Sequence, residues 1–162
     1  MNIISNTNRS QKPNSVAIVL TWLGTIPFII AALISLSQYI PENIFKPILY
    51  AEFKAKALIH SYSVVIASFL AGIQWGVSIN QNKNTQFFIM SNVIAIAAWL
   101  SLMAFSSTFS LSVILIALIV ALFGDYRAFS LQFIPHWFWK LRKKATLVAC
   151  TSMLIVILPS YF

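Results

Sequence analysis

The chain has 162 residues, of which 59% are hydrophobic and only 9% are charged, whereas soluble domains average about half apolar and about a quarter charged. A soluble fold of this size would leave much apolar surface in water, so the composition excludes an ordinary soluble domain and indicates a protein that lies in lipid. The formal charge of +8 does not indicate a nucleic-acid partner, because the basic residues lie at the ends of apolar stretches and form no solvated stripe.

The N-terminal part of the chain predicts a tail followed by a membrane span. Residues 1–14 are rich in Asn and Ser and predict a disordered cytoplasmic tail. Ser15 to Leu36 contains no charge and is long enough to cross about 30 Å of hydrocarbon, which predicts the first transmembrane helix. It is too long for the apolar core of a cleavable signal peptide, and no Arg-rich transit peptide precedes it, which favours a bacterial protein. Gly24 and Pro27 predict a kink in this helix, because proline frees a backbone carbonyl.

The second span carries a pattern of small residues. Residues 37–56 contain prolines and charged side chains and predict a loop, with room for a short interfacial segment. Ala57 to Ile79 is free of charge and predicts the second transmembrane helix. Within it Ser68, Gly72 and Gly76 are spaced four apart, so they share one helical face and allow another backbone to approach closely. The simpler interpretation is packing inside the bundle, and the alternative is the seam of a homodimer.

Polar side chains within the spans are candidates for function. Gln74 lies deep in the second span, where its amide needs a hydrogen-bond partner. Asn92 of the next span is the candidate partner, and a substrate-binding role for Gln74 is the alternative. His60 lies near the outer end of its span, where interfacial hydrogen bonding is expected, because proton transfer would need ionisable groups in mid-span and the sequence has none. His136 is expected on the opposite side of the membrane, so no metal site is predicted.

The next two spans come from one long uncharged stretch. Residues 80–86 are polar and predict a turn. No charge occurs from Phe87 to Gly124, and a single helix over that range would be about 57 Å long, nearly twice the hydrocarbon core. A reversal at Ser106 to Thr108 therefore divides it into a third span, Phe87 to Phe105, and a fourth, Phe109 to Gly124.

Charges and aromatic rings gather between the fourth span and a short fifth one. Residues 125–144 hold this charged and aromatic segment, and residues 145–160 predict the fifth span. Asp125 lies beside Arg127, which predicts a local surface ion pair at the helix end. The segment continues with a set of rings and cations that predicts an interfacial anchor for anionic lipid headgroups. Its members are Trp137, Trp139, Lys140, Arg142, Lys143 and Lys144. Recognition of one specific lipid is the sharper alternative.

The placement of Lys and Arg predicts the orientation, because cytoplasmic loops carry the excess of these residues. With five spans and a cytoplasmic N-terminus, the inner side holds Arg9, Lys12, Lys83, Arg127, Lys140, Arg142, Lys143 and Lys144. The outer side then holds only Lys46, Lys54 and Lys56. We therefore expect the N-terminus inside and the C-terminus outside.

Several motifs together resemble one known family. In chain order they are Trp22-Leu-Gly-Thr-Ile-Pro27-Phe28, Tyr62, Ser68-Phe-Leu-Ala-Gly-Ile-Gln-Trp-Gly76, Asp125-Tyr-Arg127, Pro135-His-Trp137, Leu141-Arg142 and Thr146. This set is similar to the membrane family of unknown function that includes transmembrane protein 69, from about Trp22 to the last helix. The chain differs at Ala71 and Gln74, where that family commonly has Gly and a basic residue. The resemblance implies an architecture and brings no activity, substrate or cofactor.

The expected function is correspondingly general. No Walker loop, His-Glu-x-x-His motif or Rossmann glycine pattern is present, and three acidic residues offer little to acid–base catalysis, so neither an enzyme nor a cofactor is predicted. The expected fold is an all-α polytopic membrane helix bundle, with residues 15–162 as one domain. We expect a non-enzymatic accessory or assembly partner in the bacterial inner (plasma) membrane, acting on a membrane protein or on lipid. The alternative is a small transporter or channel with Gln74, Asn92, Gly24 and Pro27 along a polar path.

Overall fold

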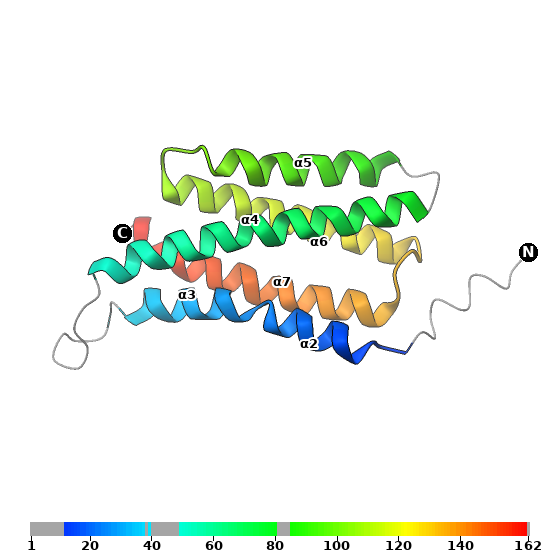
Figure 1. The fold of residues 1–162 in the computed structure, drawn as a ribbon, viewed down its shortest axis with the longest axis horizontal. Helices are drawn as coiled ribbons and strands as arrows, with labels where there is room; N and C mark the ends of the chain where they lie inside the picture. The colour runs from blue at the N-terminus through cyan, green and yellow to red at the C-terminus, as the bar shows by residue number, and fades with distance from the viewer. Residues whose placement is uncertain (1–11, 38, 40–48, 81–84, 162) are drawn as a thin grey trace, which may run out of the picture.

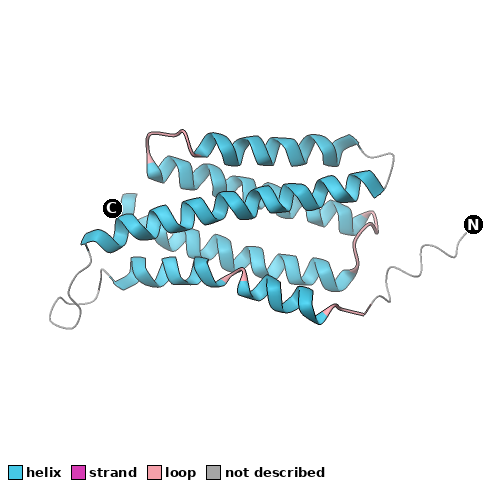
Figure 2. Cartoon of the chain, viewed as in Figure 1, coloured by secondary structure: helices cyan, strands magenta, loops and turns pink. Residues whose placement is uncertain are grey.

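The computed structural model describes residues 12–37, 39, 49–80 and 85–161, and all regular structure within these ranges is helical (Figure 2). The helices are α2 (Ser15–Leu23), α3 (Ile26–Ser37), α4 (Leu49–Asn80), α5 (Thr85–Ser101), α6 (Ser107–Ser130) and α7 (His136–Ile157), followed by the 3₁₀ turn η1 (Leu158–Tyr161). They form one up-and-down bundle in which α2 and α3 make a single interrupted rod (Figure 1). The predicted disordered tail lies outside the described residues up to position 11, and Asn14 caps α2 by accepting from the Val16 amide at 2.9 Å.

The predicted kink of the first span is confirmed as a break between α2 and α3. α2 ends at Leu23 and α3 begins at Ile26, with Gly24 and Thr25 in between. The Tyr62 hydroxyl of α4 donates to the Gly24 carbonyl at 2.9 Å. A neighbouring helix therefore satisfies the backbone at the break, which is how membrane proteins tolerate proline and glycine in a span.

α4 is longer than the predicted second span. It begins at Leu49, so the prediction of a loop is wrong over residues 49–56. A helix of this length extends about 48 Å, well beyond about 30 Å of hydrocarbon. Charged residues near its start marked the expected edge of the membrane, but a helix continues beyond that edge wherever its backbone bonds can form.

The turn between α5 and α6 is short. α5 ends at Ser101, short of the predicted Phe105, and Ser106 caps α6 by accepting from the Phe109 amide at 3.4 Å. The predicted reversal is confirmed, but it lies at residues 102–106 and not at Ser106 to Thr108, because Ser107 and Thr108 already belong to α6.

A second tight turn joins α6 to α7, so residues 125–144 form most of a helical hairpin. Gln132 adopts φ 62°. The Phe133 amide donates to the Ala128 carbonyl at 2.8 Å and the Gln132 amide to the Phe129 carbonyl at 2.9 Å. This pair of bonds is the Schellman closure of a helix end, and it turns α7 back along α6 at once.

The surface of the bundle is that of a membrane protein. Three helical stretches of the described residues are long and apolar enough to cross a membrane, namely Ser15–Ser37, Lys54–Ile79 and Ser107–Ser130, and Thr85–Ser101 is a shorter apolar helix. Large apolar side chains such as Val65 point outward, 62% exposed, which lipid tolerates and water does not. The buried core instead contains many alanines, as in helices that pack closely in membranes.

Candidate functional site

The face of α4 that carries the predicted small-residue pattern points away from the bundle. Ser68, Gly72 and Gly76 are all exposed. A Cβ atom built on Gly72 or on Gly76 would meet no atom of the described residues within 4 Å. The prediction that this face packs inside the bundle is therefore wrong, and the face remains free for contacts outside this chain.

A second set of small residues makes the bundle-facing side of α4. Ser63, Ala67 and Ala71 are also spaced four apart, and all three are buried. The helix thus carries two offset faces of small residues, either of which allows close approach. The buried face also presents Gln74, whose polar group is better placed in the bundle than in lipid.

Gln74 reaches α6 and does not reach α5. Its side chain is 2% exposed and its Nε2 donates to the Ala121 carbonyl at 2.9 Å. Asn92 is exposed and donates to the Phe88 carbonyl of its own helix at 2.8 Å. The predicted pairing of Gln74 with Asn92 is therefore wrong, because the two side chains leave their helices in different directions.

Gly124 creates the space that Gln74 occupies. A Cβ atom at position 124 would collide with Gln74 Nε2 and with Met90 Cε, and it would lie 2.8 Å from Gln74 Cδ. Any side chain at this position would therefore displace Gln74 or Met90 where α4, α5 and α6 meet.

Asp125, one position further along α6, is ion-paired across the helical hairpin. Its Oδ2 lies 2.9 Å from Nε of Arg142 on α7. The predicted local pair with Arg127 is wrong, because residues two apart on a helix do not face each other. Arg142 is 8% exposed, so it belongs to the interior and not to the predicted headgroup anchor. The Gln74 side chain also interacts with the Asp125 carboxylate.

This buried cluster has unused hydrogen-bonding capacity. Arg142 Nη2, Gln74 Oε1 and Trp137 Nε1 are buried and have no hydrogen-bond partner among the described residues. A buried polar atom without a partner costs about 1–3 kcal/mol, and more when the group is charged. The arginine is therefore the group with the most to gain from an additional acceptor.

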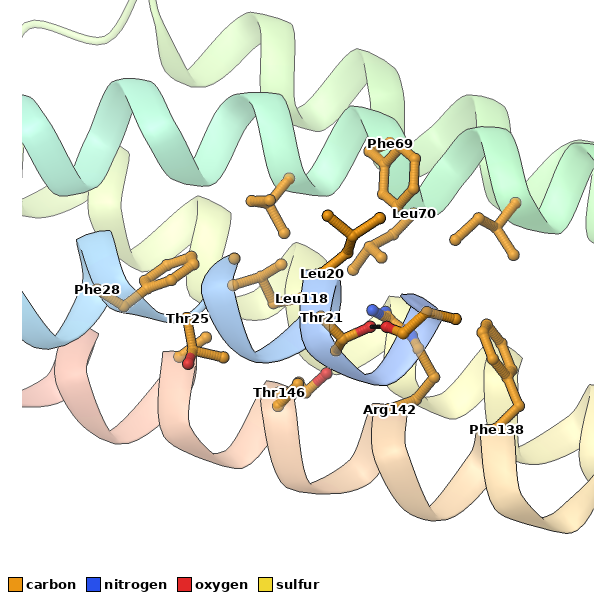
Figure 3. Close-up of a pocket in the computed structure, with 16 residues that line it drawn as sticks. Leu20, Thr21, Thr25, Phe28, Phe69, Leu70, Leu118, Phe138, Arg142 and Thr146 are labelled. Carbon is orange, nitrogen blue, oxygen red and sulfur yellow. Dashed lines mark hydrogen bonds between the residues drawn. The ribbon is translucent and has the colours of Figure 1, made fainter. Parts of the chain in front are cut away.

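A pocket of about 330 Å³ adjoins Arg142, between α2, α4, α6 and α7. Its walls are mainly apolar, with Leu20, Phe69 and Leu118 among them. Figure 3 shows the Arg142 side chain extending from α7 in among the residues that line the pocket. Three threonines also line it, namely Thr21, Thr25 and Thr146.

The break after α2 explains why this pocket exists. α3 packs against both α4 and α7, whereas α2 packs chiefly on α7. Figure 1 shows that α2, on the N-terminal side of the break, diverges from α4. Gly24 and Pro27, predicted to produce a kink, therefore open a space between α2 and the rest of the bundle.

The first turns of α7 contain the aromatic and basic residues of the predicted headgroup anchor, and part of this set is exposed. The Trp139 ring stacks on Phe129, with centroids 6.0 Å apart and planes at 13°, and its centroid lies 5.6 Å from that of Tyr126. Both tryptophans of the segment are half-buried. The exposed cations there are Lys140, Lys143 and Lys144. They form a basic edge at the end of the bundle where α7 begins, which we call the basic edge below.

The remaining candidates lie elsewhere. His60 is half-buried, and its Nε2 lies 3.1 Å from the Ser101 hydroxyl at the end of α5. Within the part of the chain that the structure describes, no group of three His, Cys, Asp or Glu side chains could hold a metal ion.

Sequence reasoning missed the pocket and the pairing of Asp125 with Arg142. One signal was available for the pair. Residues 125 and 142 are almost equally far from Phe133, the middle of the turn between α6 and α7, so a helical hairpin places them at the same level. That argument needs α6 to continue past Asp125, whereas the charges suggested that the span ended there.

Comparisons with known proteins relate the chain to a membrane family of unknown function. A family model described as "Protein of unknown function (DUF3429)" matches residues 13–158. "Transmembrane protein 69" of Xenopus tropicalis is 30% identical over 143 residues, which cover 85% of this chain and 51% of that protein. The chain thus spans about half the length of this relative. No solved structure gives a significant match.

Proposed function

The chain belongs to the DUF3429 family of proteins of unknown function, and we propose that it is a non-enzymatic accessory or assembly partner of another protein in the bacterial inner membrane. The observation that carries the proposal is the outward face formed by Ser68, Gly72 and Gly76. We call this the α4 glycine face. It binds a transmembrane helix of the partner.

The physics of helix association in lipid supports this role. Lipid tails are as apolar as leucine, so helices associate in a membrane through close packing and interhelical hydrogen bonds. Two exposed glycines with no neighbouring atoms near the Cβ position leave backbone accessible to a second helix. Exposed Val65 lies on the same side of α4 as Gly72, because residues seven apart return to nearly the same direction. The two glycines thus form a shallow groove for a partner helix, and the Val65 side chain provides an apolar contact beside it.

The proposal includes five membrane crossings with a cytoplasmic N-terminus and the C-terminus outside. The start of α2 and the end of α7 lie at opposite ends of the bundle (Figure 1), as an odd number of crossings requires. The basic edge lies at the same end as the start of α2, and Lys54 and Lys56 lie at the other end. The excess of cations at the first end supports a cytoplasmic location. There the basic edge attracts anionic lipid headgroups, at about 1 kcal/mol for each cation.

The alternative of a transporter or channel has less support. Gly24 lines the pocket beside Arg142, but Gln74 and Asn92 do not. Asn92 faces outward and Gln74 is bonded to α6. The residues expected along a polar path thus do not face one cavity.

Site-specific photocrosslinking in native membranes tests the proposal. A benzoylphenylalanine at Val65 should give an adduct with one membrane protein, which mass spectrometry of the adduct identifies. Gly72→Leu should abolish the adduct because the added side chain fills the groove. Thr151→Leu, which adds similar bulk at an exposed position on α7, should leave it unchanged. An adduct only with a second copy of the chain, or only with lipid, would refute a heterologous protein partner.

A further inference from the structure

The pocket beside Arg142 has the size and lining of a ligand site. Its volume of about 330 Å³ lies at the lower end of the range of about 300–1,000 Å³ for such sites. It runs along α7 from Phe138 to Ala149, which is about 16 Å at 1.5 Å per residue. Figure 3 shows Phe138 and Phe28 toward its two ends. An elongated apolar space suits a flexible hydrocarbon chain better than a compact polar molecule.

Arg142 supplies a polar group to this space, one turn of α7 inside its Phe138 end. The side chain is 9% exposed, and its Nε is engaged by Asp125 at 2.9 Å. Its Nη2 is buried and has no acceptor among the described residues. Figure 3 draws the guanidinium of Arg142 among the residues that line the pocket, so a small shift of this side chain would offer an oxygen atom there a charge-assisted hydrogen bond.

The charge of the site favours a neutral acceptor. Asp125 already balances Arg142, and both groups are buried. A carboxylate or phosphate in the pocket would leave one uncompensated negative charge in a medium of low dielectric, which is strongly unfavourable. A carbonyl oxygen accepts the same hydrogen bond without that cost.

The pocket is reached from the lipid. Leu20 on α2 and Phe69 on α4 line it and are also exposed, 61% and 63%, so its mouth lies between these helices. Arg142 is followed in the chain by the exposed Lys143 and Lys144, whose ammonium groups reach the headgroup region. Arg142 is thus placed near the boundary between headgroups and hydrocarbon, where the ester carbonyls of glycerolipids lie.

We propose that this pocket holds one acyl chain of a membrane glycerolipid, whose ester carbonyl oxygen accepts a hydrogen bond from Arg142 Nη2. The chain enters between α2 and α4 and lies along α7 toward Phe28. This inference does not depend on the α4 glycine face, because the two surfaces involve different residues and a different kind of partner.

Photolabelling tests occupation of the pocket. The purified protein is reconstituted into vesicles of phosphatidylethanolamine and phosphatidylglycerol that contain a phosphatidylethanolamine with a diazirine in mid-chain. Irradiation should label Ile66, Ile73 or Leu118, which line the pocket. Ala17→Phe fills the pocket from α2 and should remove most of this labelling. Val19→Phe adds a ring at a position of α2 that is exposed and outside the pocket, and it should leave the labelling unchanged.

Competition tests the carbonyl contact in the unmodified protein. When the bulk lipids of the vesicles are replaced by diether lipids with the same headgroups and chains, which compete less well, labelling by the ester probe should rise about threefold, since hydrogen bonds in membranes average about 0.6 kcal/mol. Arg142→Lys keeps a cation for Asp125 but lacks the forked donor, so it should remove the ester preference while the pocket is still labelled.

Three results would overturn the proposal. Equal labelling of the lining residues in Ala17→Phe and in the unmodified protein would show that the pocket is not the site. Equal competition by ester and ether lipids would remove the carbonyl contact. Stronger competition by oleate than by the diester lipid would show that the site prefers an anion.

Discussion

The carboxylate of Asp125 on α6 and the guanidinium of Arg142 on α7 approach to 2.9 Å, with side chains only 5% and 9% exposed. Gln74 of α4 interacts with the same carboxylate and donates to Ala121 one turn earlier on α6. Three helices therefore meet at one buried polar cluster. Such a cluster tolerates little sliding of the helices, because any shift leaves a charge or an amide unpaired in a medium of low dielectric.

Removing one partner of the ion pair should lower the free energy of unfolding more than removing both partners. We expect Arg142→Met to lower the free energy of unfolding in detergent micelles by about 3–5 kcal/mol, because Asp125 is left charged and buried. Combining it with Asp125→Leu should recover most of the loss. Arg127→Met, which removes the cation next to Asp125 in the chain, should cost at most about 1 kcal/mol. A larger loss for Arg127→Met than for Arg142→Met would refute the pairing.

Gly124 should not tolerate a methyl group. We expect Gly124→Ala to lower the free energy of unfolding by about 1–3 kcal/mol, because the new Cβ would overlap Gln74 and Met90. The matched control is Gly76→Ala, where the space is open and alanine should leave stability unchanged or slightly higher. Thermal unfolding in the same detergent measures both variants. Equal effects of the two substitutions would contradict the close approach at Gly124.

The two faces of α4 should differ sharply in their tolerance of bulk. Gly72→Leu should leave unfolding of the isolated protein within about 0.5 kcal/mol of the unmodified chain, because its face is exposed. Ala71→Leu, at the adjacent buried position, should cost about 1–3 kcal/mol through overpacking. If Gly72→Leu is the more destabilising of the two in detergent, then the glycine face, and not the alanine face, packs inside the bundle.

The turn between α6 and α7 should favour glycine at position 132. Gln132 has φ 62°, in a region that costs residues other than glycine about 1–2 kcal/mol. We expect Gln132→Gly to be more stable than Gln132→Ala by about 1 kcal/mol. Both variants remove the same side-chain interactions, so their difference in unfolding free energy isolates the backbone conformation. Equal stability would contradict the left-handed conformation at this turn.

The orientation can be measured with reporter fusions. Alkaline phosphatase fused after Phe162 should be active, because the five crossings that we propose would place that end in the periplasm. The same reporter fused after Lys83, between the second and third expected crossings, should be inactive. The reverse pattern, or inactivity at both sites, would refute the crossing number or the orientation.

The sequence was sufficient to find the helices and the reversals between most of them. Uncharged stretches of membrane length are visible without any tertiary information, and so are local turn signals such as Ser106 and the kink at Gly24 and Pro27. Errors concern helix ends: α5 stops before its predicted end, α7 begins before its predicted start, and α4 and α6 are longer than predicted. Both helices continue past the charged residues at their expected limits, because charge marks the edge of hydrocarbon and does not end a helix.

The sequence did not show which side of each helix faces the bundle. α4 carries Ser68 and Gly72 on one side and Ala67 and Ala71 on another, and both sides are apolar with small residues. In water, the polar side of a helix shows which face is exposed. In lipid that contrast is missing, because the exterior is as apolar as the core.

The amino-acid sequence by itself therefore determined that this is a helical membrane protein, which segments are helical in outline, and where the first helix breaks. Only the tertiary structure decided that Gln74 meets Ala121, that Asp125 meets Arg142, and that the broken first helix opens a pocket beside that arginine. Hydropathy and backbone preferences act along the chain, whereas partners for buried polar groups depend on the rotation of each helix. That rotation is set by packing between segments far apart in the sequence.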